Sequence, residues 1–223
     1  MSADLRIAIT VPSHGQWCAG TAQNIANMVQ TFTAARYDGG SKVAEVFAVS
    51  GSMLPDVRHR CVYEAAKWDA THLLTLDADM LVPRDTLQML LRHGKPIVGA
   101  NYSRRQIGTL TTCHGLDGET VYTEEGDTRL LEVAHVGTGC LLVDMRVFDA
   151  LDLPYFAFET DASGVGLVGE DVYFCRKARA VGFQVFCDQQ LSWEIGHIGE
   201  TTYTHHMVNV ARREAAALQI AAE

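Results

Sequence analysis

Two aspartates end an apolar run in the sequence. The run THLLTLDADML covers Thr71 to Leu81 and holds Asp77 and Asp79 with only Ala78 between them. In an extended strand, side chains two residues apart project to the same face, so both carboxylates can point to one site. Adjacent carboxylates repel each other, and a hard divalent ion such as Mg²⁺ or Mn²⁺ relieves that repulsion because it prefers oxygen ligands. The alternative is that one aspartate caps a turn and the other is solvated.

Strand and helix patterns alternate through the first half of the chain. Apolar runs of strand length are followed by helical spacing, as at Ile25, Met28, Val29 and Phe32. This alternation predicts a mostly parallel α/β sheet with helices on both faces, and such sheets bind ligands at the carboxyl ends of their strands. The expected elements are strands at Arg6–Val11, Lys42–Ser50, Thr71–Leu81 and Ile97–Ala100, a helix at Pro55–Trp68 and one that starts near Pro83.

The second half has a different pattern. Gly108 to Val136 alternates short polar and apolar pieces with turn signals, which predicts an antiparallel hairpin region. A strand at Cys140–Asp144, a helix at Glu170–Val181 and a strand at Gln184–Asp188 follow, and a polar segment with histidines leads to a final helix. We expect a single domain over residues 1–223.

Composition limits the possible partners. The formal net charge is −9, which disfavours nucleic acid as the default partner. The six cysteines form no C-x-x-C pair, which predicts reduced thiols in a core. No stretch is long and apolar enough for a membrane span, and the start of the chain has no basic, apolar leader pattern, so we expect a cytoplasmic protein.

Several motifs occur in order along the chain and together resemble one family. The motifs are TVPSHG (Thr10–Gly15), PDVRHRCVYEA (Pro55–Ala65), THLLTLDADML, PIVGANYSRR (Pro96–Arg105), VGTGCLLVD (Val136–Asp144), GEDVYFCRKARAVGF (Gly169–Phe183) and GHIG (Gly196–Gly199). With them, the sequence from Arg6 to Gly199 is similar to the metal-dependent glycosyltransferases with the A-type, Rossmann-like fold, in particular short single-domain members from bacteria and bacteriophages. The expected location is then the cytoplasm of a bacterial or infected host cell.

The resemblance implies a donor site in the first half of the chain. Residues 1–101 would bind a nucleotide-sugar, most commonly a UDP-sugar in this family, and residues 102–223 would bind the acceptor. The D-A-D segment would contact the donor, with Asp77 mainly near the ribose and Asp79 mainly on a Mn²⁺ or Mg²⁺ ion. Around the base and ribose the resemblance implies three loop residues: Pro12, Ser13 and His14.

Arg58 is a further donor-binding candidate by the same resemblance. The related pattern commonly has Arg-Asn at this place, whereas here His59 replaces the asparagine. A solvated arginine is the alternative for Arg58.

The acidic pair Glu170-Asp171 opens the helix after the glycine-rich loop. Acidic residues in a first turn complement the helix dipole, which is a sufficient structural reason for both. The resemblance implies instead that Asp171 is the general base of an inverting transfer and Glu170 an acceptor or supporting contact.

Histidine, tryptophan and arginine candidates complete the expected site. The resemblance implies that His197 completes the metal shell, with His205 and His206 as alternatives. Trp193 is either an acceptor platform or a core residue. Arg104, with Arg105, Arg36 and Lys42, would form a basic patch if the acceptor were a hydroxymethylated base in phage DNA; a saccharide, lipid-linked or protein hydroxyl is equally open.

Three other functions remain as alternatives. A phosphatase-like hydrolase would use Asp77 as nucleophile, but such enzymes usually have Gly-Thr after the D-x-D, where this chain has Met80 and Leu81. A nucleotidyltransferase would normally carry a basic glycine-rich loop after its first strand, and PSHGQWCAG contains no lysine or arginine. A catalytically silent binding module is the non-enzyme alternative.

Overall fold

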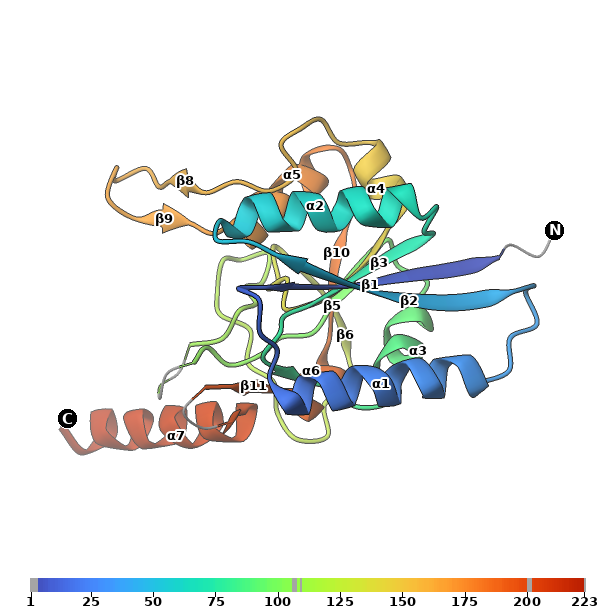
Figure 1. Cartoon of the computed structure of the whole chain (residues 1–223). Coiled ribbons are helices and arrows are strands. Elements are labelled where there is room, and N and C mark those ends of the chain that lie inside the picture. Colours follow the sequence, from blue (N-terminus) through green and yellow to red (C-terminus); the bar gives the residue numbers. More distant parts are fainter. Residues whose placement is uncertain (1–3, 106–107, 109, 200–201, 223) are drawn as a thin grey trace.

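A seven-stranded sheet forms the centre of the computed structural model, which describes residues 4–105, 108, 110–199 and 202–222. The strand order is β2-β1-β3-β7-β5-β10-β6. Strands β2, β1, β3, β5 and β10 run in one direction, and β7 and β6 run against them (Figure 1). The strands span Lys42–Ser50 (β2), Leu5–Ser13 (β1), His72–Leu76 (β3), Cys140–Asp144 (β7), Ile97–Gly99 (β5), Val185–Asp188 (β10) and Leu130–Val133 (β6).

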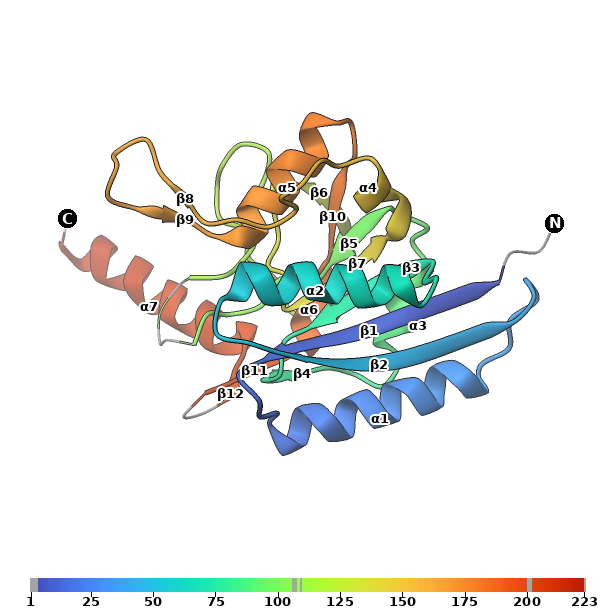
Figure 2. The ribbon, with the colours of Figure 1, turned by 45° about the horizontal axis from the view of Figure 1, so that its top comes forward.

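Helices cover both faces of this sheet (Figure 2). One face carries α1 (Ala19–Ala34) and α3 (Thr86–Leu91). The other carries α2 (Leu54–Lys67), α4 (Met145–Asp149) and α5 (Glu170–Ala180). Alternate residues of β1 are buried on opposite faces of the sheet, so both faces need a cover. Ile7 and Ile9 pack on the first face, and Ala8 between them packs on the second.

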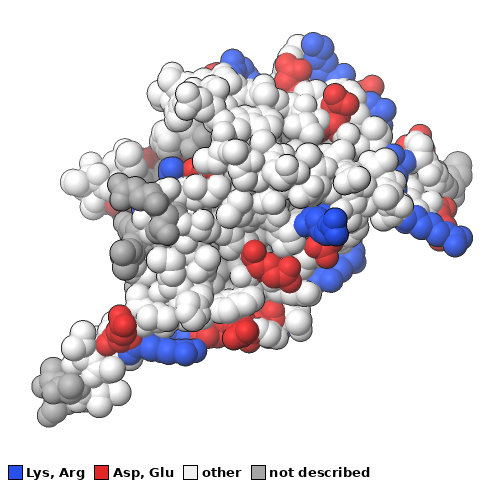
Figure 3. All heavy atoms as spheres, turned by 60° about the horizontal axis from the view of Figure 1, so that its bottom comes forward, with Lys and Arg blue, Asp and Glu red and all other residues white. Residues whose placement is uncertain are grey.

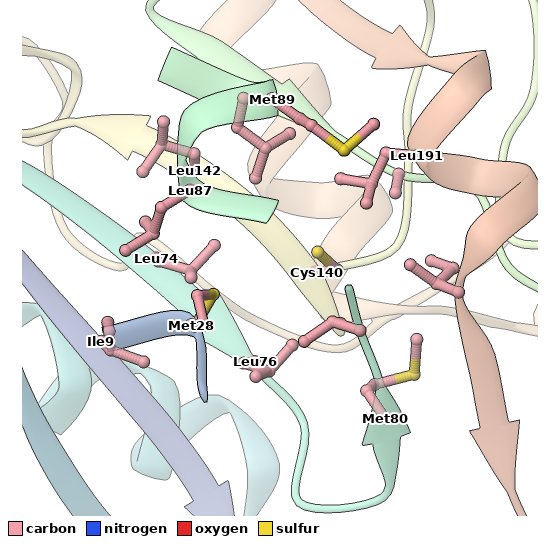
Figure 4. Close-up of a cluster of buried hydrophobic side chains, with 14 of the residues drawn as sticks. Ile9, Met28, Leu74, Leu76, Met80, Leu87, Met89, Cys140, Leu142 and Leu191 are labelled. Atoms are coloured by element: carbon pink, nitrogen blue, oxygen red, sulfur yellow. The ribbon is translucent and has the colours of Figure 1, made fainter. Parts of the chain in front are cut away.

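The core on the α1 face joins elements that are distant in sequence. Figure 4 shows Met28 of α1, Leu87 of α3 and Leu142 of β7 around Ile9 and Leu74. All five side chains are buried at 4% exposure or less. This packing fixes the carboxyl ends of β1 and β3 relative to each other.

Three smaller groups of elements complete the fold. A three-stranded sheet has the order β12-β11-β4, and β8 pairs with β9 in a hairpin. Helix α6 follows β10, and α7 ends the described chain. Their bounds are Met80–Leu81 (β4), Glu159–Thr160 (β8), Leu167–Val168 (β9), Gly196–Ile198 (β11), Thr202–Tyr203 (β12), Gln189–Glu194 (α6) and His205–Ala222 (α7).

The mostly parallel α/β class expected from the sequence is confirmed, but the single strand Thr71–Leu81 is wrong. Strand β3 ends at Leu76, and Asp77 to Met80 form a turn in which the Met80 N–H donates to the Asp77 carbonyl at 3.2 Å. A continued strand would carry both carboxylates into the core. In the turn, the side chains of Asp77 and Asp79 are 26% and 22% exposed.

Two further expectations need correction. Helix α3 starts at Thr86 instead of near Pro83, because Thr86 Oγ1 donates to the Pro83 carbonyl at 2.8 Å and ends the preceding turn. The antiparallel region expected over residues 108–136 is confirmed, but its described pairings are isolated bridges, such as His114 with Thr120 and with His135, and not one regular hairpin. Strand β6 from the same region joins the main sheet instead.

The membrane and cysteine expectations concern the whole chain. Among the helices that the structure describes, none combines the length and apolarity needed to cross a bilayer. All six cysteines are free thiols, and all except the half-buried Cys18 are buried.

Candidate functional site

A pocket of about 490 Å³ opens where β1 and β3 end, and we call it the D-A-D pocket. The end of β1 contributes Pro12 and Ser13 to its wall, and the loop that follows contributes His14. The turn after β3 contributes Asp77, Ala78 and Asp79, and its position is fixed because the Cys18 N–H donates to the Ala78 carbonyl at 2.9 Å. The structure therefore brings together all six residues expected from these two segments.

Asp77 is held from behind by a buried arginine. Arg58 of α2 donates from Nη2 to Asp77 Oδ1 and from Nε to Glu170 Oε1, both at 3.0 Å. Its side chain is only 2% exposed. Burial alone would lower the pKa of Arg58, but the carboxylates of Asp77 and Glu170 outweigh it and raise the pKa. Arg58 therefore stays charged.

This geometry adds to the role expected for Arg58. Its neighbour Val57 lines the D-A-D pocket, whereas Arg58 lies beneath the wall. Among the described atoms its Nη1 is buried without a hydrogen-bond partner. Contact of Arg58 with the donor therefore stays a prediction, and the structure adds a link through Arg58 between Asp77 and Glu170. His59, in place of the expected asparagine, is structural because its Nε2 accepts from the Tyr155 N–H at 2.9 Å.

Asp79 faces a histidine from the far end of the chain. Strand β11 pairs with β4, which sets His197 opposite Met80 and places His197 Nε2 3.4 Å from Asp79 Oδ1. His197 Nδ1 donates to the Ser103 carbonyl at 3.0 Å, so the proton on that nitrogen is fixed. A bare Nε2 and the Asp79 carboxylate are both acceptors and would repel each other. A proton on Nε2 or a cation between the two groups removes this repulsion.

The donor set at this pair fits Mn²⁺ or Mg²⁺. One carboxylate and one imidazole face the open pocket, and the imidazole is oriented by a backbone carbonyl, as metal-binding histidines usually are. Within the described residues, no group of three or more His, Cys, Asp or Glu side chains is arranged to hold a metal alone. A metal here would need further oxygen ligands from a bound molecule and water.

Arg105 supplies a positive charge to the D-A-D pocket. Its Nη1 lies 2.9 Å from Asp79 Oδ2, and its side chain is 58% exposed. Burial would raise the pKa of Asp79, but the hydrogen bond from His197 and the charges of His197 and Arg105 outweigh it and lower the pKa. Asp79 is therefore an ionised carboxylate that already attracts cationic groups.

Two glycines let a buried tyrosine approach this centre. The Gly139 N–H donates to Tyr102 Oη at 2.9 Å, and a Cβ at Gly139 would lie 2.6 Å from that oxygen and 2.9 Å from Asp77 Oδ2. A Cβ at Gly137 would lie 2.4 Å from the same hydroxyl. Burial and the carboxylates of Asp77 and Asp171 raise the pKa of Tyr102, so it stays neutral. Close packing against Tyr102 therefore requires both glycines of the V-G-T-G motif.

A second hollow, of about 590 Å³, lies at the start of α5, and we call it the Asp171 hollow. Asp171, Arg104 and His135 line it. Burial raises the pKa of Asp171, although the Val172 N–H and the charges of Arg58 and Arg104 act in the opposite direction. A raised pKa suits a general base. Burial also raises the pKa of Glu170, against the opposing charge of Arg58.

The side chains of Glu170 and Asp171 have different surroundings. Glu170 is 7% exposed, and its carboxylate is bonded to Arg58, so it supports the site from behind. Asp171 accepts only from the next backbone N–H among the hydrogen bonds of the described residues, at 2.7 Å, and opens into the hollow. The chain of contacts from Asp77 through Arg58 to Glu170 links the D-A-D pocket to the Asp171 hollow.

Three of the expected residues lie elsewhere. Trp193 lines a separate hollow with Pro83 and Glu194, away from Asp171. His205 is fully buried, with its Nε2 3.0 Å from the Asn101 carbonyl, and His206 is exposed on α7. Neither alternative histidine lines the D-A-D pocket, so the structure favours His197 among the three.

Sequence reasoning missed three residues of the site. Trp17 lines the D-A-D pocket from the loop that already supplied His14, so its position after the first strand was an available signal. Arg105 was considered only for a DNA patch. Tyr102 gave no signal, because an aromatic residue inside an apolar motif is indistinguishable from an ordinary core residue.

The expected basic patch does not form. Arg36 and Lys42 line a hollow at the start of β1, whereas Arg104 and Arg105 lie at the two hollows described above. Arg36 is paired with Asp38 at 2.8 Å, and Lys42 Nζ donates to the Phe32 and Ala35 carbonyls. On the face shown in Figure 3, basic and acidic side chains are scattered among each other.

Comparisons with known proteins concern the fold. No protein-family model and no curated protein matches the sequence. The crystal structure of A197 from STIV matches 87% of this chain and 86% of its own, with a TM-score of 0.58 and 16% identity. S. aureus TarS 1–349 matches 83% of this chain and 58% of its own, with a TM-score of 0.43 and 9% identity.

A second crystal structure of S. aureus TarS 1–349, in complex with UDP-GlcNAc, gives similar values. It matches 83% of this chain and 56% of its own, with a TM-score of 0.41 and 11% identity. The likeness to A197, together with the strand order, shows the α/β fold with a mostly parallel sheet that the sequence predicted.

Proposed function

We propose that this protein is a metal-dependent glycosyltransferase that moves a sugar from a nucleotide-diphosphate-sugar to an acceptor hydroxyl. The observation that carries the proposal is the juxtaposition of Asp79 with His197, at 3.4 Å, in a pocket lined by the loop after β1. A Mn²⁺ or Mg²⁺ ion held by these two residues would neutralise charge on the diphosphate leaving group. A UDP-sugar is the donor we expect first.

Each wall of the D-A-D pocket has a role in this proposal. Pro12, Ser13 and His14 surround the nucleoside, and Trp17 offers an aromatic face beside them. Asp77 accepts from the ribose hydroxyls, since one of its oxygens is held by Arg58 and the side chain is 26% exposed. Arg105 moves from Asp79 to the diphosphate as negative charge develops there.

The chemical step uses the Asp171 hollow. The acceptor oxygen forms its bond to the anomeric carbon while the bond from that carbon to the diphosphate oxygen breaks. Asp171 takes the proton of the acceptor hydroxyl, which its raised pKa favours. Attack from the face opposite to the leaving group would invert the configuration at the anomeric carbon.

The geometry argues against the hydrolase alternative. A phosphatase-like reaction at Asp77 would need an acidic pair nearby for Mg²⁺. Glu170 is instead neutralised by Arg58, and Asp171 opens into the other hollow.

Thermal unfolding in the presence of nucleotides tests the proposal. We expect stabilisation by one nucleoside diphosphate or nucleotide-sugar, and only with Mn²⁺ or Mg²⁺ present. At a ligand concentration of 100 times Kd the stabilisation is about 2.7 kcal/mol, or roughly 5–10 °C. The His197→Ala variant should no longer show metal-dependent stabilisation by the nucleotide. His206 is exposed on α7, so His206→Ala should still show it.

Two results would overturn the proposal. The first is a folded protein that no nucleotide stabilises, with or without metal, which would favour a silent module or a hydrolase. The second is metal-dependent stabilisation that survives in His197→Ala and disappears in His206→Ala.

A further inference from the structure

Arg104 and Arg105 are consecutive in sequence but line different hollows. Arg105 lines the D-A-D pocket and contacts Asp79, whereas Arg104 lines the Asp171 hollow. The backbone before them is held in place: Ser103 forms an antiparallel bridge with Thr111, and the Arg104 N–H donates to the Leu110 carbonyl at 3.1 Å.

The negative groups of the Asp171 hollow, other than Asp171 itself, are already engaged. Glu170 Oε1 accepts from Arg58 at 3.0 Å. Asp161 Oδ1 accepts from the backbone N–H groups of Ser163 and Gly166, at 2.9 and 3.3 Å. Glu170 is therefore balanced by Arg58, whereas Asp161 stays a charged carboxylate whose hydrogen bonds are to its own loop.

Arg104 supplies the positive charge of this hollow. It is the only lysine or arginine among the described residues that line the hollow. Its exposed guanidinium forms no ion pair or hydrogen bond with any residue for which the structure gives side-chain contacts. An exposed arginine beside a hollow is suited to fork-like pairing with a phosphate or carboxylate.

His135 adds a hydrogen-bonding group to the hollow without adding charge. Its ring stacks on His114 with a centroid distance of 4.6 Å and an interplanar angle of 25°. Burial lowers the pKa of His135 to about 4, helped by the nearby His114 and Arg104, so the ring is neutral near pH 7. The positive charge available to a ligand here therefore comes from Arg104.

We propose that the Asp171 hollow binds an acceptor carrying one phosphate or carboxylate group near the reacting hydroxyl, and that Arg104 holds this anion. The inference rests on the proposed function, because it assumes that Asp171 faces the acceptor. One unpaired arginine matches one anionic group, such as that of a phosphorylated polyol or sugar. A polyanion such as DNA is disfavoured by the net charge of −9.

Matched small probes test the inference. Glycerol 3-phosphate, glycerate and glycerol share a hydroxyl-bearing skeleton and differ in their charged group. We expect the two anionic probes, and not glycerol, to shift the NMR signals of the His135 imidazole while those of His197 stay in place. The difference between the shifts caused by glycerol 3-phosphate and by glycerate shows whether the hollow prefers a phosphate or a carboxylate.

Variants at the two consecutive arginines provide the control. Arg104→Gln should weaken binding of the anionic probes about tenfold to a hundredfold, the effect of removing a charge-assisted hydrogen-bonding group. Arg105→Gln should leave that binding in place, because its side chain lies in the other pocket. The side chain of Arg104 is exposed and unpaired, so Arg104→Gln should fold with an unchanged Tm.

Several outcomes would overturn the inference. The first two are equal binding of glycerol and glycerol 3-phosphate, and no binding of either. The third is binding of the anionic probes that depends on Arg105 instead of Arg104. The fourth is strongly salt-dependent binding of a DNA duplex that Arg104→Gln leaves unchanged. Nucleotide stabilisation measured in the same samples separates the two proposals. If it persists in the wild type and in Arg104→Gln, the proposed function stands even where the anion site fails.

Discussion

Asp171 is the residue at which stability and the proposed activity conflict. Burial raises its pKa, so its ionisation is less favourable in the folded chain than in the unfolded chain. A raised folded pKa gives a stabilising contribution that is fully present below the unfolded pKa and is lost as pH rises through the folded pKa. Above the folded pKa of Asp171 the molecule therefore carries an ionised carboxylate at a cost in the free energy of unfolding.

Replacing this carboxylate should separate the two effects. Asp171→Asn should reduce sugar transfer by about 10²–10⁴-fold, the range for removal of a general base, while metal-dependent nucleotide stabilisation remains. Its Tm should exceed that of the wild type at pH 7, and the difference should shrink as pH falls below the Asp171 pKa. Calorimetry across this pH range and a transfer assay provide the measurements.

Asp149→Asn is the matched control for charge. Asp149 is exposed on α4, so the same loss of one negative charge should change Tm little at either pH. Near-normal transfer by Asp171→Asn would contradict the assignment of the base. A Tm gain that did not depend on pH would contradict the role of its ionisation.

At the scale of elements, helix α2 connects the two hollows. Arg58 projects from α2 and bonds both Asp77, after β3, and Glu170, at the start of α5. These contacts lie after the end of β3 and at the beginning of α5. Regular backbone hydrogen bonding does not link the three elements there. A buried arginine between two carboxylates supplies that link, and it also sets the position of the adjacent Asp171.

Removal of this arginine should damage both the fold and the site. Arg58→Met leaves Asp77 and Glu170 without their buried partner, so the free energy of unfolding should fall by about 3–5 kcal/mol, or roughly 6–20 °C in Tm. Denaturant unfolding measures the loss. Nucleotide stabilisation should also decline, because Asp77 loses its fixed position.

Arg60 on the same helix is the control for this substitution. It pairs with Asp56 at 3.7 Å, and the two side chains are 48% and 68% exposed. Exposed pairs of this kind contribute little, so Arg60→Met should change stability by no more than about 0.5–1 kcal/mol. Equal losses for the two variants would show that Arg58 has no special role in linking the elements.

At the scale of the molecule, both hollows and two projecting segments lie toward the end of the sheet where β1 finishes. Figures 1 and 2 show α7 and the β8–β9 hairpin projecting at that end. Helix α7 is attached through its first turns, where Val208 and Asn209 are 2% and 4% exposed. Residues 213–220 are exposed along the rest of the helix.

The described packing predicts how much of α7 the fold needs. Truncation after Arg213 should change Tm by no more than about 2 °C, since the removed residues with described side chains are exposed. Truncation after Thr204 should lower Tm strongly, because it removes buried His205 and Val208 and the Asn209 bond to the Thr123 carbonyl at 3.0 Å. Thermal unfolding of the two truncated chains decides between these outcomes, and similar Tm values would contradict the prediction.

The sequence by itself determined the alternation of elements and the places where chemistry could occur. Apolar spacing located β1 and α1, because periodicity records which face of an element is buried. It placed Asp77 and Asp79 after a buried strand and Asp171 at the start of a helix. It did not fix the turn at the D-A-D segment, since an apolar run does not show where one sheet ends and another begins.

Only the tertiary structure decided which residues face each other. Arg58 lies 19 positions from Asp77 and 112 from Glu170, so its spacing alone could not distinguish a buried link from a solvated side chain. The choice of His197 over His205 depended on the pairing of β11 with β4. Arg104 and Arg105 line different hollows although they are consecutive in sequence. In each case the partner comes from a distant segment, and local periodicity carries no information about it.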